Sequence, residues 1–176
     1  ISTAIIKTNP ELVLDLHNDW RKSIPYALID PYPGKEREAV YEKVKKFANE
    51  TGLLVIEEDI ANESYVWSKT ISGSMLLRGI PSLSLELGES FVVNEENVEI
   101  GVKVIWNILA YLGMVPLTEK FFYPLEHRFK GSILKYSQQP ASPTSGLIRF
   151  MVRPGEVIKK GQAIVRIDNA FGKLLT

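Results

Sequence analysis

The sequence predicts an α/β fold with a mostly parallel or mixed sheet, followed by a small all-β module. Short apolar runs alternate with segments of helical periodicity over residues 1–117. A stretch at 138–146 is rich in Pro, Ser and Gly and has the composition of a linker. Beyond it, short alternating runs are separated by Gly turns. We therefore expect an α/β domain over 1–117, connecting strands and a linker over 118–145, and a partial β-barrel module over 146–176.

Four runs are predicted to be strands of the sheet because each is short, apolar and bounded by turn residues or polar clusters. They are Leu12–His17, Ile24–Ile29, Leu53–Ile56 and Ile80–Leu87. The first run ends in the polar cluster His17-Asn18-Asp19, as in a buried strand that delivers side chains to a site. The last run has Ser82, Ser84 and Glu86 at alternate positions, so these three share one face.

Three segments are predicted to be helices. The first spans 35–51 and ends at Gly52, and the second is a short helix over 68–79. The third is long, begins after Asn94 as its N-cap and ends before Gly113. Its apolar stripe at helical spacing, which we expect to face the core, consists of Val98, Val102, Ile105, Leu109 and Leu112.

The composition excludes several classes of partner and site. Lys and Arg number 21, as do Asp and Glu, so no net charge attracts nucleic acid or an anionic membrane. The absence of cysteine excludes disulfides, thiolate metal sites and cysteine nucleophiles, so any metal must be held by His, Asp or Glu. No apolar run approaches the ~20 residues of a membrane span. No signal peptide is evident either, so we expect a cytoplasmic protein and a segment that starts within a longer one.

Two residues are candidates for chemistry. His17 ends one predicted strand, and Glu86 lies near the end of another, just before Gly88. In α/β sheets, active residues gather at the carboxyl ends of strands. A lone histidine at a strand end is more often structural than a metal ligand. Glu86 is less easily explained as structural, because a carboxylate on an apolar strand is rarely buried without a partner or a metal.

Two segments resemble motifs of a known family. Asp15-Leu-His-Asn18 resembles the segment that supplies the third zinc ligand in the succinylglutamate desuccinylase and aspartoacylase family. Gly79-Ile-Pro-Ser-Leu-Ser-Leu-Glu-Leu-Gly88 resembles the segment that carries the family's catalytic glutamate. The long helix that follows and the β module after the linker occur in the same order. The resemblance implies a metallocarboxypeptidase-like mixed sheet flanked by helices, followed by a lipoyl-like barrel-sandwich module.

The resemblance also implies a function and residue roles. The protein would be a zinc-dependent hydrolase of the amide bond in an N-acyl amino acid or related small molecule. His17 would be a zinc ligand, and Glu86 would exchange protons as general acid and base with a metal-activated water. Asn18 and Arg78 would bind substrate, and Asp15 would orient His17. The resemblance is also compatible with a homo-oligomer.

The sequence departs from the family pattern in its metal ligands. The family's first two ligands come from a His-x-x-Glu motif, which does not occur before His17. His127 is the other histidine, and it matches no ligand position. The 1–117 domain is therefore expected to be a partial catalytic domain, truncated at its N-terminus, and the β module to be incomplete at its C-terminus. Two hypotheses stay open: a deacylase whose missing ligands precede this segment, or a non-catalytic binding or assembly module.

Overall fold

The computed structural model of the 176-residue chain describes all residues except 20–21, 60–68, 117–118, 125–128 and 138–139. His127 lies outside the described residues. The chain divides into two compact units, Ile1–Tyr136 and Ser137–Thr176.

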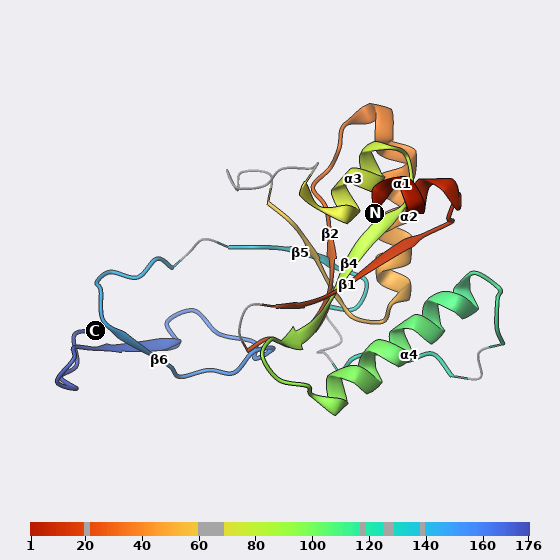
Figure 1. Ribbon diagram of the computed structural model, residues 1–176. Helices are drawn as coiled ribbons and strands as arrows, with labels where there is room; N and C mark the ends of the chain where they lie inside the picture. The colour runs from red at the N-terminus through yellow and green to blue at the C-terminus, as the bar shows by residue number, and fades with distance from the viewer. Residues whose placement is uncertain (20–21, 60–68, 117–118, 125–128, 138–139) are drawn as a thin grey trace. The chain divides into compact units, whose positions relative to one another are not determined.

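The first unit is built on a mixed five-stranded sheet with the order β1-β4-β2-β3-β5 (Figure 1). The strands are β1 (Val13–Asp19), β2 (Pro25–Ile29), β3 (Leu54–Glu57), β4 (Ser82–Glu89) and β5 (Ile133–Lys135). Strand β4 runs parallel to β1 and antiparallel to β2, whereas β2, β3 and β5 are mutually parallel. The mixed sheet confirms the predicted α/β class, and the four predicted strands lie within one or two residues of β1 to β4.

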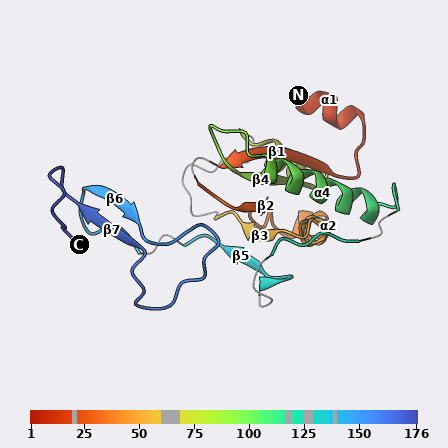
Figure 2. The ribbon, with the colours of Figure 1, turned by 90° about the horizontal axis from the view of Figure 1, so that it is seen from below.

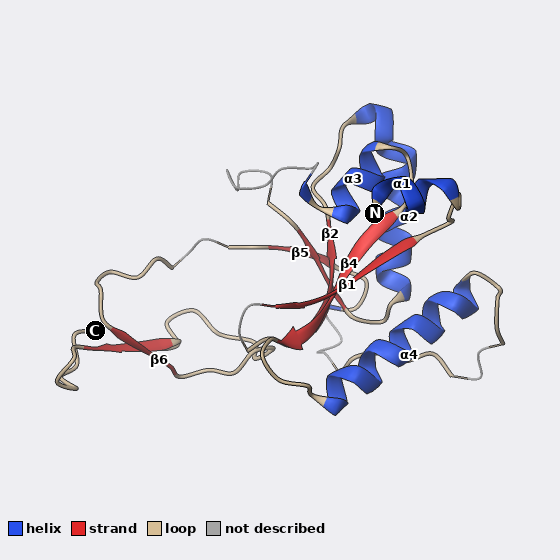
Figure 3. Ribbon diagram, viewed as in Figure 1, coloured by secondary structure: helices blue, strands red, loops and turns tan. Residues whose placement is uncertain are grey.

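Helices α1 (Ser2–Lys7), α2 (Glu38–Glu50), α3 (Ile71–Leu77) and α4 (Glu95–Tyr111) accompany the sheet, with a 3-10 turn at Lys35–Arg37 before α2 (Figure 3). Asn94, Gly52 and Gly113 mark helix ends as predicted, whereas helix α1 and the Thr70 cap of α3 were not predicted. The Asn94 side chain accepts a hydrogen bond from the Glu96 N–H at 3.0 Å, and Thr70 accepts one from the Gly73 N–H at 3.1 Å. Gly52 and Gly113 have positive φ angles just beyond α2 and α4. No helix among the described residues is long and apolar enough to cross a membrane.

The two faces of β4 differ sharply in character. Leu83 and Leu85 are fully buried and belong to the hydrophobic core, together with apolar residues of α2 and α4. The alternate residues Ser82, Ser84 and Glu86 are also buried, and they share the opposite face as predicted. Viewed from below, α4 lies along the sheet beside β4 (Figure 2). One face of β4 therefore holds the fold together, and the other presents polar groups.

The predicted core face of α4 was wrong for Val98 and Val102, which are both 48% exposed. The buried residues form a helical stripe on another side of the same helix: Asn97, Ile100, Gly101, Val104, Asn107 and Ile108. Apolar residues occur on both sides of α4, so periodicity alone favoured the wrong one. Two asparagines in the true core stripe concealed it, because asparagine is mostly found at the surface.

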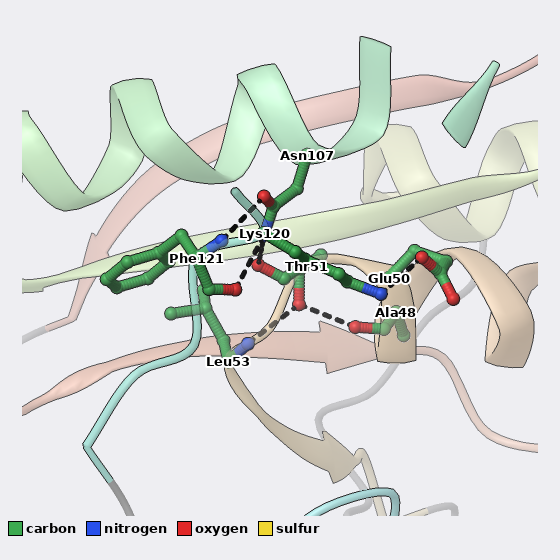
Figure 4. Close-up of polar contacts among 7 residues, drawn as sticks. All are labelled: Ala48, Glu50, Thr51, Leu53, Asn107, Lys120 and Phe121. Carbon is green, nitrogen blue, oxygen red and sulfur yellow. Dashed lines mark hydrogen bonds and ion pairs between the residues drawn. The ribbon is translucent and has the colours of Figure 1, made fainter. Parts of the chain in front are cut away.

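Asn107 faces the core because it anchors two chain segments (Figure 4). Its side-chain amide donates to the carbonyls of Thr51 at 3.0 Å and Phe121 at 2.8 Å, and its oxygen accepts from the Phe121 N–H at 3.0 Å. The Thr51 hydroxyl in turn accepts from the Leu53 N–H at 3.1 Å. Asn107 is 2% exposed, so its hydrogen bonds replace those that water would make with these backbone groups. Helix α4 is thereby joined to the end of α2 and to the segment before β5.

The second unit contains one antiparallel pair, β6 (Leu147–Phe150) and β7 (Val165–Asp168), and no helix among its described residues. The buried Asp168 carboxylate accepts from Arg166 Nε and from Arg149 Nε, each at 2.8 Å. Arg166, with Arg149, holds the pKa of Asp168 below its usual range. This charge cluster lies on the paired strands and ties them together.

Candidate active site

The register of the sheet brings His17 and Glu86 together. His17 of β1 pairs with Glu86 of β4, and Glu86 pairs with Tyr26 of β2. Directly paired residues point to the same face, with Cβ atoms about 5 Å apart. Three side chains from three strands, of which β4 is distant in the sequence from β1 and β2, therefore form a row across the sheet. Their positions near strand ends made His17 and Glu86 candidates for a site, whereas the sequence held no such indication for Tyr26.

A cavity of about 430 Å³ opens over this face of the sheet. Asp15, His17, Ser84 and Glu86 line one part of it. The end of β2, Glu58 beyond β3 and the residues that begin α3 line the remainder. The volume suits a small molecule rather than a macromolecular chain. The row of polar residues thus lies at the wall of a space that can hold a substrate.

The buried carboxyl group of Glu86 is not fully hydrogen-bonded. Its side chain is 9% exposed, and Oε2 has no hydrogen-bond partner among the described residues. Burial raises the pKa of Glu86, the charge of His17 opposes this rise, and Asp19 and Asp15 add to it. A carboxyl group with a raised pKa can both accept and return a proton near neutral pH. These properties are common among catalytic carboxyl groups.

Asp15 and His17 form a pair on the same strand face. His17 Nε2 lies 3.2 Å from Asp15 Oδ1, and the His17 side chain is 54% exposed. The contact fixes the direction of the imidazole ring, and it leaves the second ring nitrogen for another partner. Its geometry is compatible with the orienting role that the sequence suggested for Asp15.

The other two sequence candidates lie away from the row. Asn18 is exposed where the β1–β4 register shifts, and its side chain donates to the Glu89 carbonyl at 3.4 Å. Arg78 is exposed just after α3, donates from Nη1 to the Ser74 carbonyl at 2.7 Å, and is outside the set of residues that line the cavity. The structure therefore groups Asp15, His17 and Glu86, and it does not bring Arg78 to them.

A tyrosine pair beside Glu86 was missed by sequence reasoning. The Tyr26 hydroxyl donates to Asp19 Oδ2 at 3.2 Å and lies 3.1 Å from the Tyr136 hydroxyl. Burial raises the pKa of both phenols, so each stays protonated and able to donate. Strand alternation places Asp19 on the face of His17, and this signal was available. No sequence signal fixed the antiparallel register that sets Tyr26 opposite Glu86.

Gly88 allows the close approach of α4 to the end of β4. Its φ angle is 87°, and a Cβ atom there would lie 2.2 Å from Asn97 Nδ2. The next residue, Glu89, accepts from Asn94 Nδ2 at 2.9 Å, and this hydrogen bond lowers the pKa of Glu89. The strand that carries Glu86 is thus fixed to α4 just beyond the site.

The described residues alone do not provide a complete zinc site. Catalytic zinc takes three protein ligands and one water. No group of three or more His, Asp or Glu side chains suited to a metal occurs in the described part of the chain. His17 offers one nitrogen, and the buried Glu86 Oε2 lies beside it in the same row. His17 and Glu86 would therefore supply at most part of the ligand set of a zinc ion.

Comparison with known proteins gives matches of structure only. No protein-family profile and no curated protein matches the sequence. A succinylglutamate desuccinylase/aspartoacylase from Rhodobacter sphaeroides has a similar fold, with a TM-score of 0.70, 20% identity, and coverage of 96% of this chain and 49% of the other. The ectoine utilization protein EutE (DoeB) from Ruegeria pomeroyi, solved with product bound, matches with a TM-score of 0.65 and 16% identity over 92% of this chain and 47% of the other.

A succinylglutamate desuccinylase from a Silicibacter species gives a TM-score of 0.65 and 16% identity, over 93% of this chain and 47% of the other. The chain therefore shares the fold of these proteins over nearly its whole length. It spans about half the length of each of them.

Proposed function

We propose that the chain forms half of a zinc-dependent deacylase similar to the succinylglutamate desuccinylases and aspartoacylases. Its substrate would be an N-acyl amino acid or related small amide in the cytoplasm. Residues 1–117 would be a partial catalytic domain of metallocarboxypeptidase-like fold, 118–145 the connection, and 146–176 part of a lipoyl-like module. The observation that carries the proposal is the buried, incompletely bonded Glu86, held in register with His17 at the wall of the cavity.

Glu86 is the residue to which we assign proton transfer. Its carboxylate takes a proton from the water that attacks the amide carbonyl, and it then gives that proton to the departing amine nitrogen. The raised pKa favours this second step, because it makes the protonated form of the carboxyl group easier to reach. Asp15 keeps the His17 ring fixed while this occurs.

The zinc ion requires ligands beyond the described residues, and we assign His17 as the one that this chain provides. Two features support a catalytic domain with a larger sheet than the one described. The matched proteins are about twice as long. Strand β1 also lies at the edge of the sheet and exposes 52% of Leu16, on the strand face that otherwise packs into the core. A further strand beside β1 would cover both the open edge and this side chain.

Zinc content and hydrolysis test the proposal together. The complete gene product is expected to contain one zinc ion per chain and to hydrolyse N-acyl amino acids. His17→Ala should lower zinc content, measured by mass spectrometry of the metal, by at least about tenfold, because one of three protein ligands is lost. Lys43→Ala, on the exposed side of α2, is the control. A zinc content unchanged by His17→Ala would reject the ligand assignment.

The lack of three metal-binding side chains among the described residues favours a second candidate, a non-catalytic binding or assembly module. Such a module would hold no stoichiometric zinc in the complete gene product. Zinc analysis therefore separates the two candidates before any substrate is known.

A further inference from the structure

A chain of two phenol hydroxyls and one carboxylate crosses the sheet beside Glu86. The Tyr26 hydroxyl donates to Asp19 Oδ2 at 3.2 Å and lies 3.1 Å from the Tyr136 hydroxyl. A phenol has a single hydrogen to donate, and that of Tyr26 is given to Asp19, so Tyr136 is the donor in the second hydrogen bond. The chain therefore runs from Tyr136 through Tyr26 to Asp19. The proton-transfer chemistry proposed above does not use it.

The strand order determines the path of this chain. Strand β4 lies between β1, which carries Asp19, and β2, which carries Tyr26. Strands β1 and β2 are thus about 10 Å apart, twice the spacing of neighbouring strands, and the Tyr26 side chain must cross β4 to reach Asp19. The β4 residue paired with Tyr26 is Glu86, and paired residues point to the same face. The Tyr26 ring therefore crosses β4 next to the Glu86 side chain.

Tyr136 provides the other end of the chain. It follows β5, and β3 separates β5 from β2, so the hydroxyl of Tyr136 reaches that of Tyr26 across β3. Burial raises the pKa of both phenols, and the negative charge of Glu86 adds to each rise, as expected for two rings near its carboxyl group. Both rings therefore belong to the surroundings of Glu86, although they come from different strands.

The two hydrogen bonds hold the Tyr26 hydroxyl from opposite sides. Tyr26 is buried, so water cannot readily replace a partner that its hydroxyl loses. Without the hydroxyl of Tyr136, the ring would keep Asp19 as its hydrogen-bond partner and lose the support from β5. The ring could then shift over β4, and the Glu86 side chain beside it could shift as well. A displacement of about 1 Å at a reacting group can lower a rate by about 100-fold.

We propose that Tyr136 is a positioning residue for Glu86: its hydrogen bond holds the Tyr26 ring over β4, and that ring keeps the Glu86 side chain in place at the cavity wall. Tyr136 is not among the residues that line this cavity, so it acts through Tyr26 and not on the substrate. The inference rests on the proposed deacylase function for its effect on the rate, but not for its effect on the position of Glu86.

Kinetics of the complete gene product with a panel of N-acetyl and N-succinyl amino acids test the effect on the rate. Tyr136→Phe keeps the ring and removes the hydroxyl, and kcat should fall at least about fivefold with KM and zinc content unchanged. Adding Tyr136→Phe to Tyr26→Phe should lower kcat no further, because Tyr136 acts through the Tyr26 hydroxyl. Tyr111→Phe on α4 is the matched control, because its ring contact with Phe47 does not need the hydroxyl. Circular dichroism checks that each variant is folded.

Carbon-13 NMR of the same protein, labelled at the glutamate carboxyl carbons, tests the position of Glu86 without a substrate. The signal that is missing in Glu86→Gln identifies this residue. Tyr136→Phe should move that signal by more than its line width, and Tyr111→Phe should leave it in place.

The two measurements separate this inference from the proposed function. An unmoved Glu86 signal in Tyr136→Phe would overturn the inference whether or not the protein hydrolyses amides. An unaltered kcat in Tyr136→Phe, or a further fall in the double variant, would overturn it as well. A moved signal in a protein that hydrolyses no member of the panel would support the positioning role and count against the deacylase.

Discussion

Asn107 and Glu86 are both buried polar residues of the same unit, but they differ in how their polar atoms are satisfied. The Asn107 side chain makes three hydrogen bonds to backbone groups of Thr51 and Phe121, so its burial is compensated (Figure 4). Glu86 leaves one oxygen without a hydrogen-bond partner among the described residues. Asn107 therefore stabilises the fold, whereas Glu86 costs stability and suits a function. Substitutions at the two positions should change stability in opposite directions.

Asn107→Ala is expected to have the largest effect on stability. It leaves the Phe121 N–H and two carbonyls buried without their partner, which should lower the free energy of unfolding by about 3 kcal/mol. Urea denaturation followed by circular dichroism measures this loss. Asn49→Ala on α2 is the control, because Asn49 makes none of these bonds, and it should change stability by less than about 0.5 kcal/mol. Equal losses for the two variants would contradict the anchoring role.

Asn94→Ala should have an intermediate effect. It removes the cap of α4 and the hydrogen bond to Glu89, at a cost of about 1 kcal/mol. Asn94→Ser retains a side-chain oxygen that can cap the helix, so thermal unfolding should place it closer to the unsubstituted protein. A melting temperature for Asn94→Ser as low as that for Asn94→Ala would show that the cap contributes little.

Glu86→Gln should have the smallest effect on stability, and of the opposite sign. Burial raises the pKa of Glu86, so the ionised carboxylate opposes folding, and this penalty grows as the pH rises through the pKa of the folded state. The uncharged glutamine avoids the penalty. The variant should therefore unfold at a higher urea concentration near pH 7 and show little difference at about pH 4, where the native carboxyl is protonated. The measurement is made with EDTA present. A stability loss at neutral pH would contradict the assignment of Glu86 as a strained functional group.

The same contrast explains what the sequence predicted and what it did not. The strands that carry His17 and Glu86 were recognisable because alternation and strand-end polarity depend on neighbouring residues. The partners of Asn107 lie 56 and 14 residues away in the sequence, so its anchoring role depends on tertiary packing. The buried face of α4 was mistaken for the same reason, since Asn97 and Asn107 look like surface residues until their partners are known.

In the candidate site, too, some features follow from neighbouring residues and others depend on tertiary packing. Asp15 and His17 share a strand face by simple alternation, and their contact could be anticipated. The position of Tyr26 could not, because it depends on which strands are neighbours and in which register they pair. A one-residue shift of β2 would have turned Tyr26 away from Glu86.

The rate of amide hydrolysis after Glu86→Gln tests the central claim most directly. In the complete gene product, glutamine keeps the shape of the side chain but cannot take up the proton of water. We expect kcat to fall by about 10²- to 10⁴-fold with unchanged zinc content, and Glu99→Gln on the exposed side of α4 to leave kcat unaltered. A Glu86→Gln protein that hydrolyses N-acyl substrates at the original rate would contradict the account.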